Sequence, residues 1–314
     1  MTEHVLALAG GVGGAKLALG FVCAINPEEV SIVVNTGDDD MFHGLYVCPD
    51  VDTVMYTLSG LYNAETGWGI LGDTFQTLSM LGVYGSETWF NLGDRDFGTH
   101  IIRTQLLSEG KTLSEVTELL CRKLGLKCHV IPMTNERVST VLQTETGDLP
   151  MQNYFVQERS NPVVTGIYYD GIDSAQPSAK FAQALDNSGR IVLCPSNPFL
   201  SLGPILAIQG IRDKIRQVSL SGRACIAVSP IVGGEAIKGP AAKIMKELGC
   251  KVSCLGVAEL YKDICNIFVL DEQDSQYVSE IEALGMRAVV AQTIMNTEAD
   301  KIELAKMILE LEVK

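Results

Sequence analysis

Long apolar stretches are missing from this sequence. No segment approaches the roughly 20 consecutive apolar residues that a helix needs to cross a bilayer. Ahead of the first apolar run, at residues 5–9, the chain carries the acidic Glu3 and no basic segment of the kind that opens a secretory leader. We therefore expect no membrane span and no secretion, and we place the protein in the cytoplasm.

Paired cysteines are missing as well. The nine cysteines are scattered singly, without a CxxC pair and without the close Cys and His spacings that build zinc sites. We therefore expect reduced thiols that pack as small apolar side chains, as is usual for cytoplasmic proteins.

Positive charge is scarce. The 314 residues include 24 lysines and arginines against 38 aspartates and glutamates, which gives a formal net charge of −14. A chain of this sign repels the phosphates of nucleic acids, so we expect no nucleic-acid partner.

Internal repeats and low-complexity tracts are also absent, and the 46 % hydrophobic content is sufficient for one large core.

What the sequence does contain is a regular alternation of short apolar runs with segments of helical period. Such alternation is typical of strand-helix-strand units and predicts an α/β fold with a parallel sheet. Thr112 and Glu115 have the spacing of a capping box at the start of one helix. We expect strands at 4–9, 30–35, 190–194, 224–229, 267–270 and 287–291, and helices from Ala15, Val51, Gly98 and Leu113 and near Lys180, Ala241, Val257, Ser279 and Glu298.

The pattern changes between residues 132 and 186. Short extended pieces at 138–144 and 154–156 are interrupted there by glycine and proline. We interpret this segment as a small inserted β-rich subdomain, so that residues 1–131 and 187–314 form the core.

A glycine-rich loop follows the first predicted strand. Gly10, Gly11, Gly13 and Gly14 surround Val12, and the missing side chains let backbone amides and the next helix approach a phosphate. The spacing matches neither the P-loop nor the dinucleotide fingerprint, so a plain tight turn stays an alternative.

Acidic residues gather after the second strand and again shortly afterwards. Asp38, Asp39 and Asp40 lie in one run, and Asp50 and Asp52 follow in the segment PDVDT. Carboxylates crowded at strand ends repel one another unless a cation compensates them, and oxygen ligands favour Mg²⁺ bound to a diphosphate. The alternative is a set of solvated loop acids with a helix cap at Asp50.

Three further loops carry candidate binding groups. Asn91 precedes the segment LGDRD, in which Arg95 offers a planar fork to phosphate, although an internal ion pair among the charges of this segment explains it equally well. Ser196 and Asn197 follow a buried strand in a second loop, and Gly233 lies in a third, glycine-rich one. Structural turns account for the same residues.

Histidines give a weaker signal. His4, His43, His100 and His129 are dispersed and show no Ser, His and Asp order, so packing or surface roles are expected. His43 lies close to the acidic run and its role stays open.

Eight segments taken in this order resemble the 2-phospho-L-lactate transferase family of coenzyme F420 biosynthesis, nearly from end to end. They are GGVGGAKLALG, NTGDDD, CPDVDT, LGDRDFGTHIIRTQLL, PMTNERVST, CPSNPFLSLGPIL, VSPIVGGEAIKGPAAKIM and GVAELYKDICNIFVLDEQD. The resemblance implies a transferase that moves a phosphorylated small acid from its guanosine diphosphate conjugate to 7,8-didemethyl-8-hydroxy-5-deazariboflavin and releases GMP. It also implies Mg²⁺, a Rossmann-like core and a homodimer.

The resemblance also implies roles for individual residues. Asp50 and Asp52 would lie at the deazaflavin and metal end with Asp38 and Asp39 nearby, and Asp94 and Arg95 would act with them on the transferred group. The predicted binding residues for the guanosine diphosphate conjugate and the deazaflavin are Gly10, Gly11, Gly13, Gly14, Asn91, Ser196, Asn197 and Gly233. Asn91 departs from the family pattern, which has a basic residue there.

Two alternatives and one question stay open. A regulatory protein of the same fold that binds a nucleotide sugar is the alternative function, although the GDRD and PDVD segments argue against it. A nicotinamide-dependent oxidoreductase is disfavoured because it would have a single acid after the second strand. Phospholactate, phosphoenolpyruvate and phosphoglycerate differ by a few atoms, and the sequence does not discriminate among them as the transferred acid.

Overall fold

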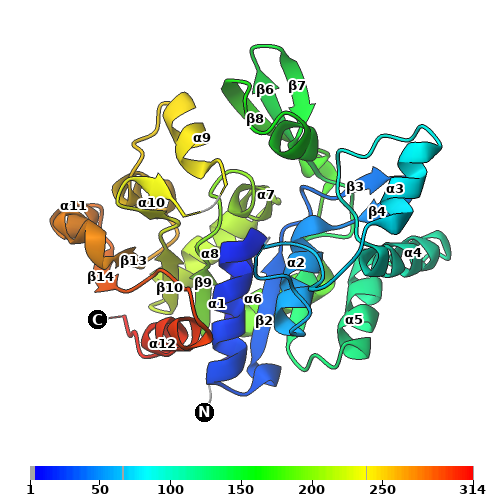
Figure 1. Ribbon diagram of the computed structural model, residues 1–314. Coiled ribbons are helices and arrows are strands. Elements are labelled where there is room, and N and C mark those ends of the chain that lie inside the picture. Colours follow the sequence, from blue (N-terminus) through cyan, green and yellow to red (C-terminus); the bar gives the residue numbers. More distant parts are fainter. Residues whose placement is uncertain (1–3, 66, 238, 314) are drawn as a thin grey trace.

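The central element of the computed structural model, which describes residues 4–65, 67–237 and 239–313, is a seven-stranded sheet (Figure 1). Every pair of neighbouring strands in it is parallel. Its order is β14 (Arg287–Ala291), β13 (Ile267–Asp271), β10 (Ala224–Val228), β9 (Arg190–Leu193), β1 (Val5–Ala9), β2 (Val30–Val34) and β5 (His129–Pro132). The predicted α/β class is confirmed.

Both faces of this sheet are covered, which explains why its strands are mostly apolar rather than alternating. In β1, Leu6 and Leu8 point into one core, and Val5, Ala7 and Ala9 point into the other. The second core is covered by α1 (Gly11–Ala24), α2 (Pro49–Leu58), α5 (Leu113–Lys123) and α12 (Glu298–Leu309). The first is covered by α6 (Ala179–Asn187), α7 (Leu202–Ala207), α8 (Ile211–Leu220), α9 (Ala241–Glu247), α10 (Cys254–Tyr261) and α11 (Val278–Ala283).

Smaller antiparallel elements lie at the carboxyl ends of the central strands. A three-stranded sheet has the order β7 (Gly147–Pro150), β6 (Ser139–Thr144) and β8 (Val164–Asp170), and Figure 1 shows it beyond the central sheet, between α9 and α3 (Gln76–Val83). Two hairpins join β3 (Asp40–Phe42) to β4 (Leu45–Val47) and β11 (Ile231–Val232) to β12 (Glu235–Ala236). The predicted β-rich segment is present, and its independence as a subdomain stays a prediction.

Several boundaries differ from the expected ones. The fourth helix, α4 (Asp94–Ser108), begins four residues before Gly98 because Gly93 and the acidic first turn already support it. The extended piece predicted at 154–156 is wrong, since residues 153–157 form one turn of π-helix. The capping box of Thr112 and Glu115 is confirmed at α5. Strand β5 and helices α3, α7 and α8 were not predicted.

The thiols behave as expected from their scattered positions. All nine cysteines are free, and most of them are buried. Burial raises the pKa of Cys194 and Cys225, which keeps these thiols protonated and unreactive. Among the helices described, none combines the length and the apolar composition that a membrane crossing requires.

Chain order places a crevice in the middle of the sheet. After β1 the chain adds β2 and β5 on one side, and it then returns to add β9, β10, β13 and β14 on the other. The loops that follow β1 and β9 therefore diverge to opposite faces, and ligands of open α/β sheets bind where this happens.

Candidate active site

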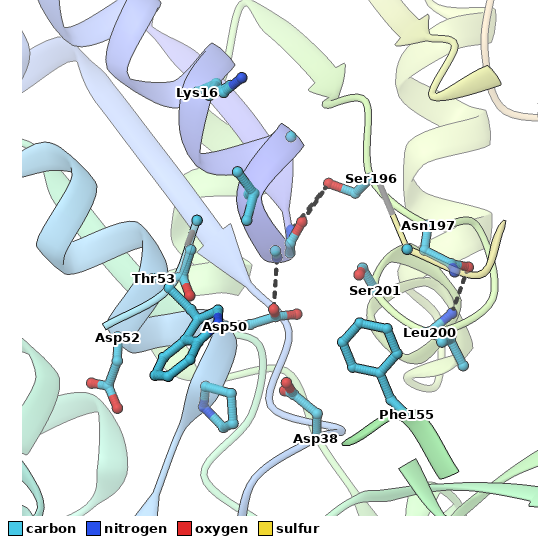
Figure 2. Close-up of a pocket in the computed structure, with 18 of the residues that line it drawn as sticks. Lys16, Asp38, Asp50, Asp52, Thr53, Phe155, Ser196, Asn197, Leu200 and Ser201 are labelled. Carbon is cyan, nitrogen blue, oxygen red and sulfur yellow. Dashed lines mark hydrogen bonds between the residues drawn. The ribbon is translucent and has the colours of Figure 1, made fainter. Parts of the chain in front are cut away.

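A cavity of about 560 Å³ lies at this switch point (Figure 2). Its walls come from the loops after β1, β2, β9 and β14, from one face of α2, and from the segment between β7 and β8. The charged and polar residues among those that line it are Lys16, Asp38, Asp50, Asp52, Thr53, Tyr56, Asn91, Asp96, His100, Gln152, Ser196, Asn197, Ser201, Thr293 and Asn296.

Close packing explains the first two glycines of the loop after β1. A Cβ on Gly10 would come within 2.5 Å of both Asp50 Oδ2 and Ser201 Cβ. Gly11 has a φ of +63°, a left-handed conformation that other residues rarely adopt. These two positions let the acidic side chain of Asp50 reach the start of α1.

Gly13 and Gly14 bring α1 against the loop that follows β9. A Cβ on Gly13 would lie 2.2 Å from the Pro195 carbonyl oxygen, and one on Gly14 would lie 2.6 Å from Ser196 Oγ. Ser196 Oγ donates to the Gly10 carbonyl at 2.8 Å and accepts from the Gly10 amide at 3.2 Å. The structure therefore brings the predicted glycines and Ser196 together, with Ser196 joining the two loops.

Asp50 binds the amino end of α1 rather than capping its own helix. Its Oδ1 accepts from the Gly11 amide at 2.6 Å, drawn as the dashed line at Asp50 in Figure 2, and its Oδ2 accepts from Asn35 Nδ2 at 2.9 Å. Burial raises the pKa of Asp50 to about 6, although the hydrogen bonds from Asn35 and Gly11 oppose that rise.

Asp38 shares the Asn35 amide with Asp50. Its Oδ1 lies 3.2 Å from Asn35 Nδ2, and its Oδ2 accepts from Gln152 Nε2 at 3.2 Å. The same Asn35 nitrogen is also 3.2 Å from the Leu200 carbonyl oxygen. An amide has two hydrogens and faces three acceptors here, so it cannot give each acceptor a hydrogen of its own. Burial and the charge of Asp50 raise the pKa of Asp38 well above its usual value.

Asp39 lies behind this pair and does not line the cavity among the described residues. Neither of its buried carboxylate oxygens has a conventional hydrogen bond. Burial raises its pKa, and the Cys48 thiol and the charge of Arg103 oppose the rise. Asp38, Asp39 and Asp50 therefore form an undercompensated acid group.

Asp52 belongs to a different environment. Figure 2 shows it apart from Asp38 and Asp50, and its carboxylate is held by both terminal nitrogens of Arg103, with Nη1 at 3.0 Å from Oδ2. Arg103 is fully buried. Burial alone would lower the pKa of Arg103, but the Asp52 carboxylate holds it well above its usual value. Asp52 is therefore neutralised by the protein itself.

His100 and Asp96 extend this second group along α4. His100 Nδ1 lies 3.1 Å from Arg103 Nη1, and His100 Nε2 lies 3.2 Å from Asp96 Oδ1. Tyr56 Oη donates to the same Asp96 oxygen at 2.6 Å. Burial would raise the pKa of Asp96, yet His100 leads the groups that hold it below its usual value. We call Asp52, Arg103, His100 and Asp96 the paired acid group.

Asp94 and Arg95 do not reach the cavity in the part of the chain described. Asp94 accepts from the amides of Gln76 at 3.0 Å and Thr77 at 2.8 Å. A hydrogen bond from the Thr74 side chain contributes most to holding the pKa of Asp94 below its usual value, and the bonds from Thr77 and Gln76 add to this effect. Arg95 is exposed and donates from Nη1 to the Leu71 carbonyl at 3.0 Å. Asp94 therefore holds the start of α3 against α4, and Arg95 holds the segment that precedes α3.

The other predicted binding residues divide in the same way. Asn91 and Asn197 line the cavity. Asn197 Oδ1 accepts from the amides of Phe199 and Leu200, and its Nδ2 has no hydrogen bond among the described residues. Gly233 does not appear in the described lining. It forms the β11–β12 turn with a φ of +59°, and its amide donates to Asp274.

Charge in the cavity determines which cofactor fits. Among the described lining residues, Asp38, Asp50, Asp52 and Asp96 are acidic, whereas Lys16 and His100 are the basic ones, and Lys16 Nζ donates to the Met295 carbonyl at 2.7 Å. Within the described residues, no three His, Cys, Asp or Glu side chains converge as a complete metal site. Mg²⁺ often binds one or two carboxylates and completes its shell with water and substrate phosphate, so Asp38 and Asp50 fit it.

Several residues of the site were missed from the sequence. Asp96, His100 and Arg103 recur at helical spacing on one face of α4, and this pattern was available as a signal. Asn35 ends the second strand beside the acidic run and was also visible. Gln152 comes from the segment that follows β7, and nothing in the sequence indicates its contact with Asp38.

Comparisons with known proteins agree with the geometry. The family described as "2-phospho-L-lactate transferase CofD" matches residues 5–309. The 2-phospho-L-lactate transferase of Methanothermobacter thermautotrophicus is 39 % identical over 97 % of this chain and 97 % of its own length. That of Methanocaldococcus jannaschii is 38 % identical over 98 % and 97 %. The phosphoenolpyruvate transferase of Streptomyces griseus is 38 % identical over 98 % of both chains.

Solved structures support the fold at lower identity. Two structures of one Bacillus halodurans protein, one of them described as a member of the UPF0052 family, align with TM-scores of 0.62 and 0.64. The identities are 16 % and 15 %, and the alignments cover 99 % and 98 % of this chain and 100 % and 99 % of that protein. At this identity the likeness concerns the fold alone.

Proposed function

This chain belongs to the 2-phospho-L-lactate transferase CofD family, and on that premise we propose how its cavity carries out the transfer. It is a transferase of coenzyme F420 biosynthesis that moves a phospholactyl-type group from a guanosine diphosphate conjugate to the deazaflavin and releases GMP. The observation that carries this function is the end-to-end match, within which the glycine loop and the acidic loops converge on one cavity.

The reaction links the acceptor's ribityl oxygen and the oxygen of the acid through one phosphorus, as a phosphodiester. The terminal hydroxyl oxygen of the deazaflavin's ribityl chain forms a bond to the phosphorus that carries the acid. The bond from that phosphorus to the bridging oxygen breaks, GMP departs with this oxygen, and the hydroxyl proton balances its new charge. Such transfers depend on alignment and charge neutralisation rather than on a covalent enzyme intermediate.

We assign the guanosine diphosphate moiety to the loops after β1 and β9. The amides of Val12 and Gly13 lie in the first turn of α1, where helical amides have no intrahelical acceptor, and both residues line the cavity. Asn197 adds an amide donor, and Lys16 adds a positive charge on the same side. These groups suit a diphosphate, and Gly10 and Gly14 act by permitting the close packing of the loops.

We assign Mg²⁺ to Asp38 and Asp50. The cavity wall carries more carboxylates than cations, so an anionic donor would be repelled without a compensating ion. When bound there, Mg²⁺ supplies positive charge to the phosphate oxygens that gain charge during transfer. Asn35 and Gln152 orient the two carboxylates through their amide groups.

The acceptor then belongs on the remaining walls. Around the rest of the cavity lie the face of α2 with Thr53 and Tyr56, the aromatic side chains of Trp68 and Phe155, and Asn91. An apolar wall with a few polar groups suits a planar ring that carries a polyol chain. Homodimer formation and a cytoplasmic location are part of the same proposal and rest on the family.

Purified protein incubated with deazaflavin, Mg²⁺ and each of the three guanosine diphosphate conjugates tests this function. We expect GMP and a deazaflavin phosphodiester in equal amounts with at least one conjugate, and neither product in excess chelator. If no conjugate gives GMP release that depends on deazaflavin, the assignment is wrong. The ranking of the three conjugates identifies the transferred acid.

A further inference from the structure

Asp96 is an ionised carboxylate in the cavity wall, and the transfer mechanism above assigns it no role. It lies in the first turn of α4, is 7 % exposed, and lines the cavity. Its Oδ1 accepts a hydrogen bond from Tyr56 Oη at 2.6 Å and lies 3.2 Å from His100 Nε2. Its Oδ2 has no hydrogen bond among the described residues.

The groups behind Asp96 fix its charge and orientation. Arg103 has only donors, so the contact between Arg103 Nη1 and His100 Nδ1 requires this imidazole nitrogen to accept. Nε2, the other ring nitrogen, lies 3.2 Å from Asp96 Oδ1 without the alignment of a hydrogen bond. The Asp96 amide donates to Asp73 Oδ2 at 3.1 Å, and the amino end of α4 favours a negative charge.

An ionised and nearly buried carboxylate with one unused oxygen is a strong hydrogen-bond acceptor that requires a donor. The neighbouring carboxylate, Asp52, does not have this property because Arg103 binds both of its oxygens. Tyr56 and Thr53 lie on the same wall and make it polar at this point. A hydroxyl of a polyol chain satisfies Asp96 without adding charge.

We propose that Asp96 Oδ2 accepts a hydrogen bond from a hydroxyl of the acceptor's ribityl chain and thereby positions the chain for attack. This inference rests on the proposed function, and it makes Asp96 a substrate-binding residue, with His100 and Arg103 as positioning residues behind it. A weakly basic carboxylate held in this way orients a hydroxyl and leaves the proton transfer to other groups.

Fluorescence titration of the deazaflavin onto wild-type protein and Asp96→Asn tests the proposal without turnover. Loss of one charge-assisted hydrogen bond should weaken binding roughly ten- to a hundredfold. A 5-deazaflavin ring that lacks the ribityl chain should bind both proteins equally, and so should GDP. Glu115→Gln, which removes a capping carboxylate on α5 outside the described cavity lining, is the control and should leave all three affinities unchanged.

Each outcome distinguishes this inference from the function on which it rests. If wild-type protein binds deazaflavin and Asp96→Asn binds it equally well, Asp96 has no such role and the transferase assignment stands. If Asp96→Asn weakens the ring analogue and GDP as much as the deazaflavin, its effect is structural and the inference is also overturned. If wild-type protein does not bind deazaflavin at all, both ideas fail.

Discussion

Two acidic groups face one cavity in this protein, and they are built in opposite ways. Asp38 and Asp50 share a single amide from Asn35, and burial raises the pKa of both carboxyls. Asp52 and Asp96 lie on the same cavity wall with Arg103 and His100 behind them, and the pKa of Asp96 is held below its usual value. The protein supplies a cation to one group and leaves the other without one.

This difference indicates what each group does. A buried carboxylate without a partner is costly, and it persists where a ligand compensates it during function. The undercompensated acid group therefore suits a metal ion that arrives with the phosphorylated donor. The paired acid group needs no ion, and in the proposed mechanism it forms part of the wall that faces the acceptor.

Neutralising Asp50 should have the largest effect on turnover. Asp50→Asn removes a proposed metal ligand, so we expect turnover to fall on the order of a thousandfold in steady-state assays with Mg²⁺. Removing one of several repelling charges should not lower the melting temperature of the metal-free protein. Asp186→Asn, at an exposed carboxylate on α6, is the control. Retention of more than a tenth of the activity in Asp50→Asn would contradict the assignment.

Replacing Arg103 should instead have a large effect on the stability of the folded protein. Arg103→Met leaves Asp52 buried beside an apolar side chain, and we expect the free energy of unfolding in a urea titration to fall by about 3–5 kcal/mol. Arg212→Met breaks a half-exposed pair with Asp263 and should cost about 1 kcal/mol or less. Adding Asp52→Asn to Arg103→Met should restore part of the loss. If the two single variants are equally stable, the paired group is not compensated as described.

The pH dependence of stability should separate the two groups further. Because the folded-state pKa of Asp38 and Asp50 is raised, their protonation favours folding, and for Asp50 this stabilisation is lost as pH rises through about 6. The metal-free protein should therefore melt at a higher temperature near pH 5 than near pH 8, and Mg²⁺ should raise the melting temperature near pH 8. The double variant Asp38→Asn with Asp50→Asn should lose both effects. An unchanged pH slope in that variant would refute this prediction.

Arg95 should have the smallest effect on turnover. Its side chain is exposed and donates to the Leu71 carbonyl, away from the described cavity lining. Arg95→Ala should therefore lower the melting temperature by a few degrees and change turnover less than about threefold. A loss of a hundredfold or more in a variant that melts normally would return Arg95 to the active site, as the sequence had suggested.

The sequence predicted the sheet well because buried parallel strands leave an unmistakable pattern. The runs at 5–9, 30–34 and 190–193 are apolar on both faces, and the loops after them carry the glycines, acids and amides that meet in the cavity. The sequence did not separate Asp50 from Asp52, because both lie at the start of one helix and their different partners become visible only in the folded structure. Arg95 was named from the sequence and Arg103 was not considered, because a charged loop beside glycine resembles a phosphate site, whereas an arginine inside a helix resembles a surface residue.

Binding of Mn²⁺, used as a spectroscopic substitute for Mg²⁺, tests the division into two acid groups most directly. Electron paramagnetic resonance titrations in the presence of GDP would compare the wild-type protein with Asp50→Asn and Asp96→Asn. We predict tight binding to the wild type, a loss of at least tenfold in affinity in Asp50→Asn, and unchanged binding in Asp96→Asn, because the ion compensates only the group that lacks a protein cation. Equal binding by Asp50→Asn and the wild type, or loss of binding in Asp96→Asn alone, would contradict this account.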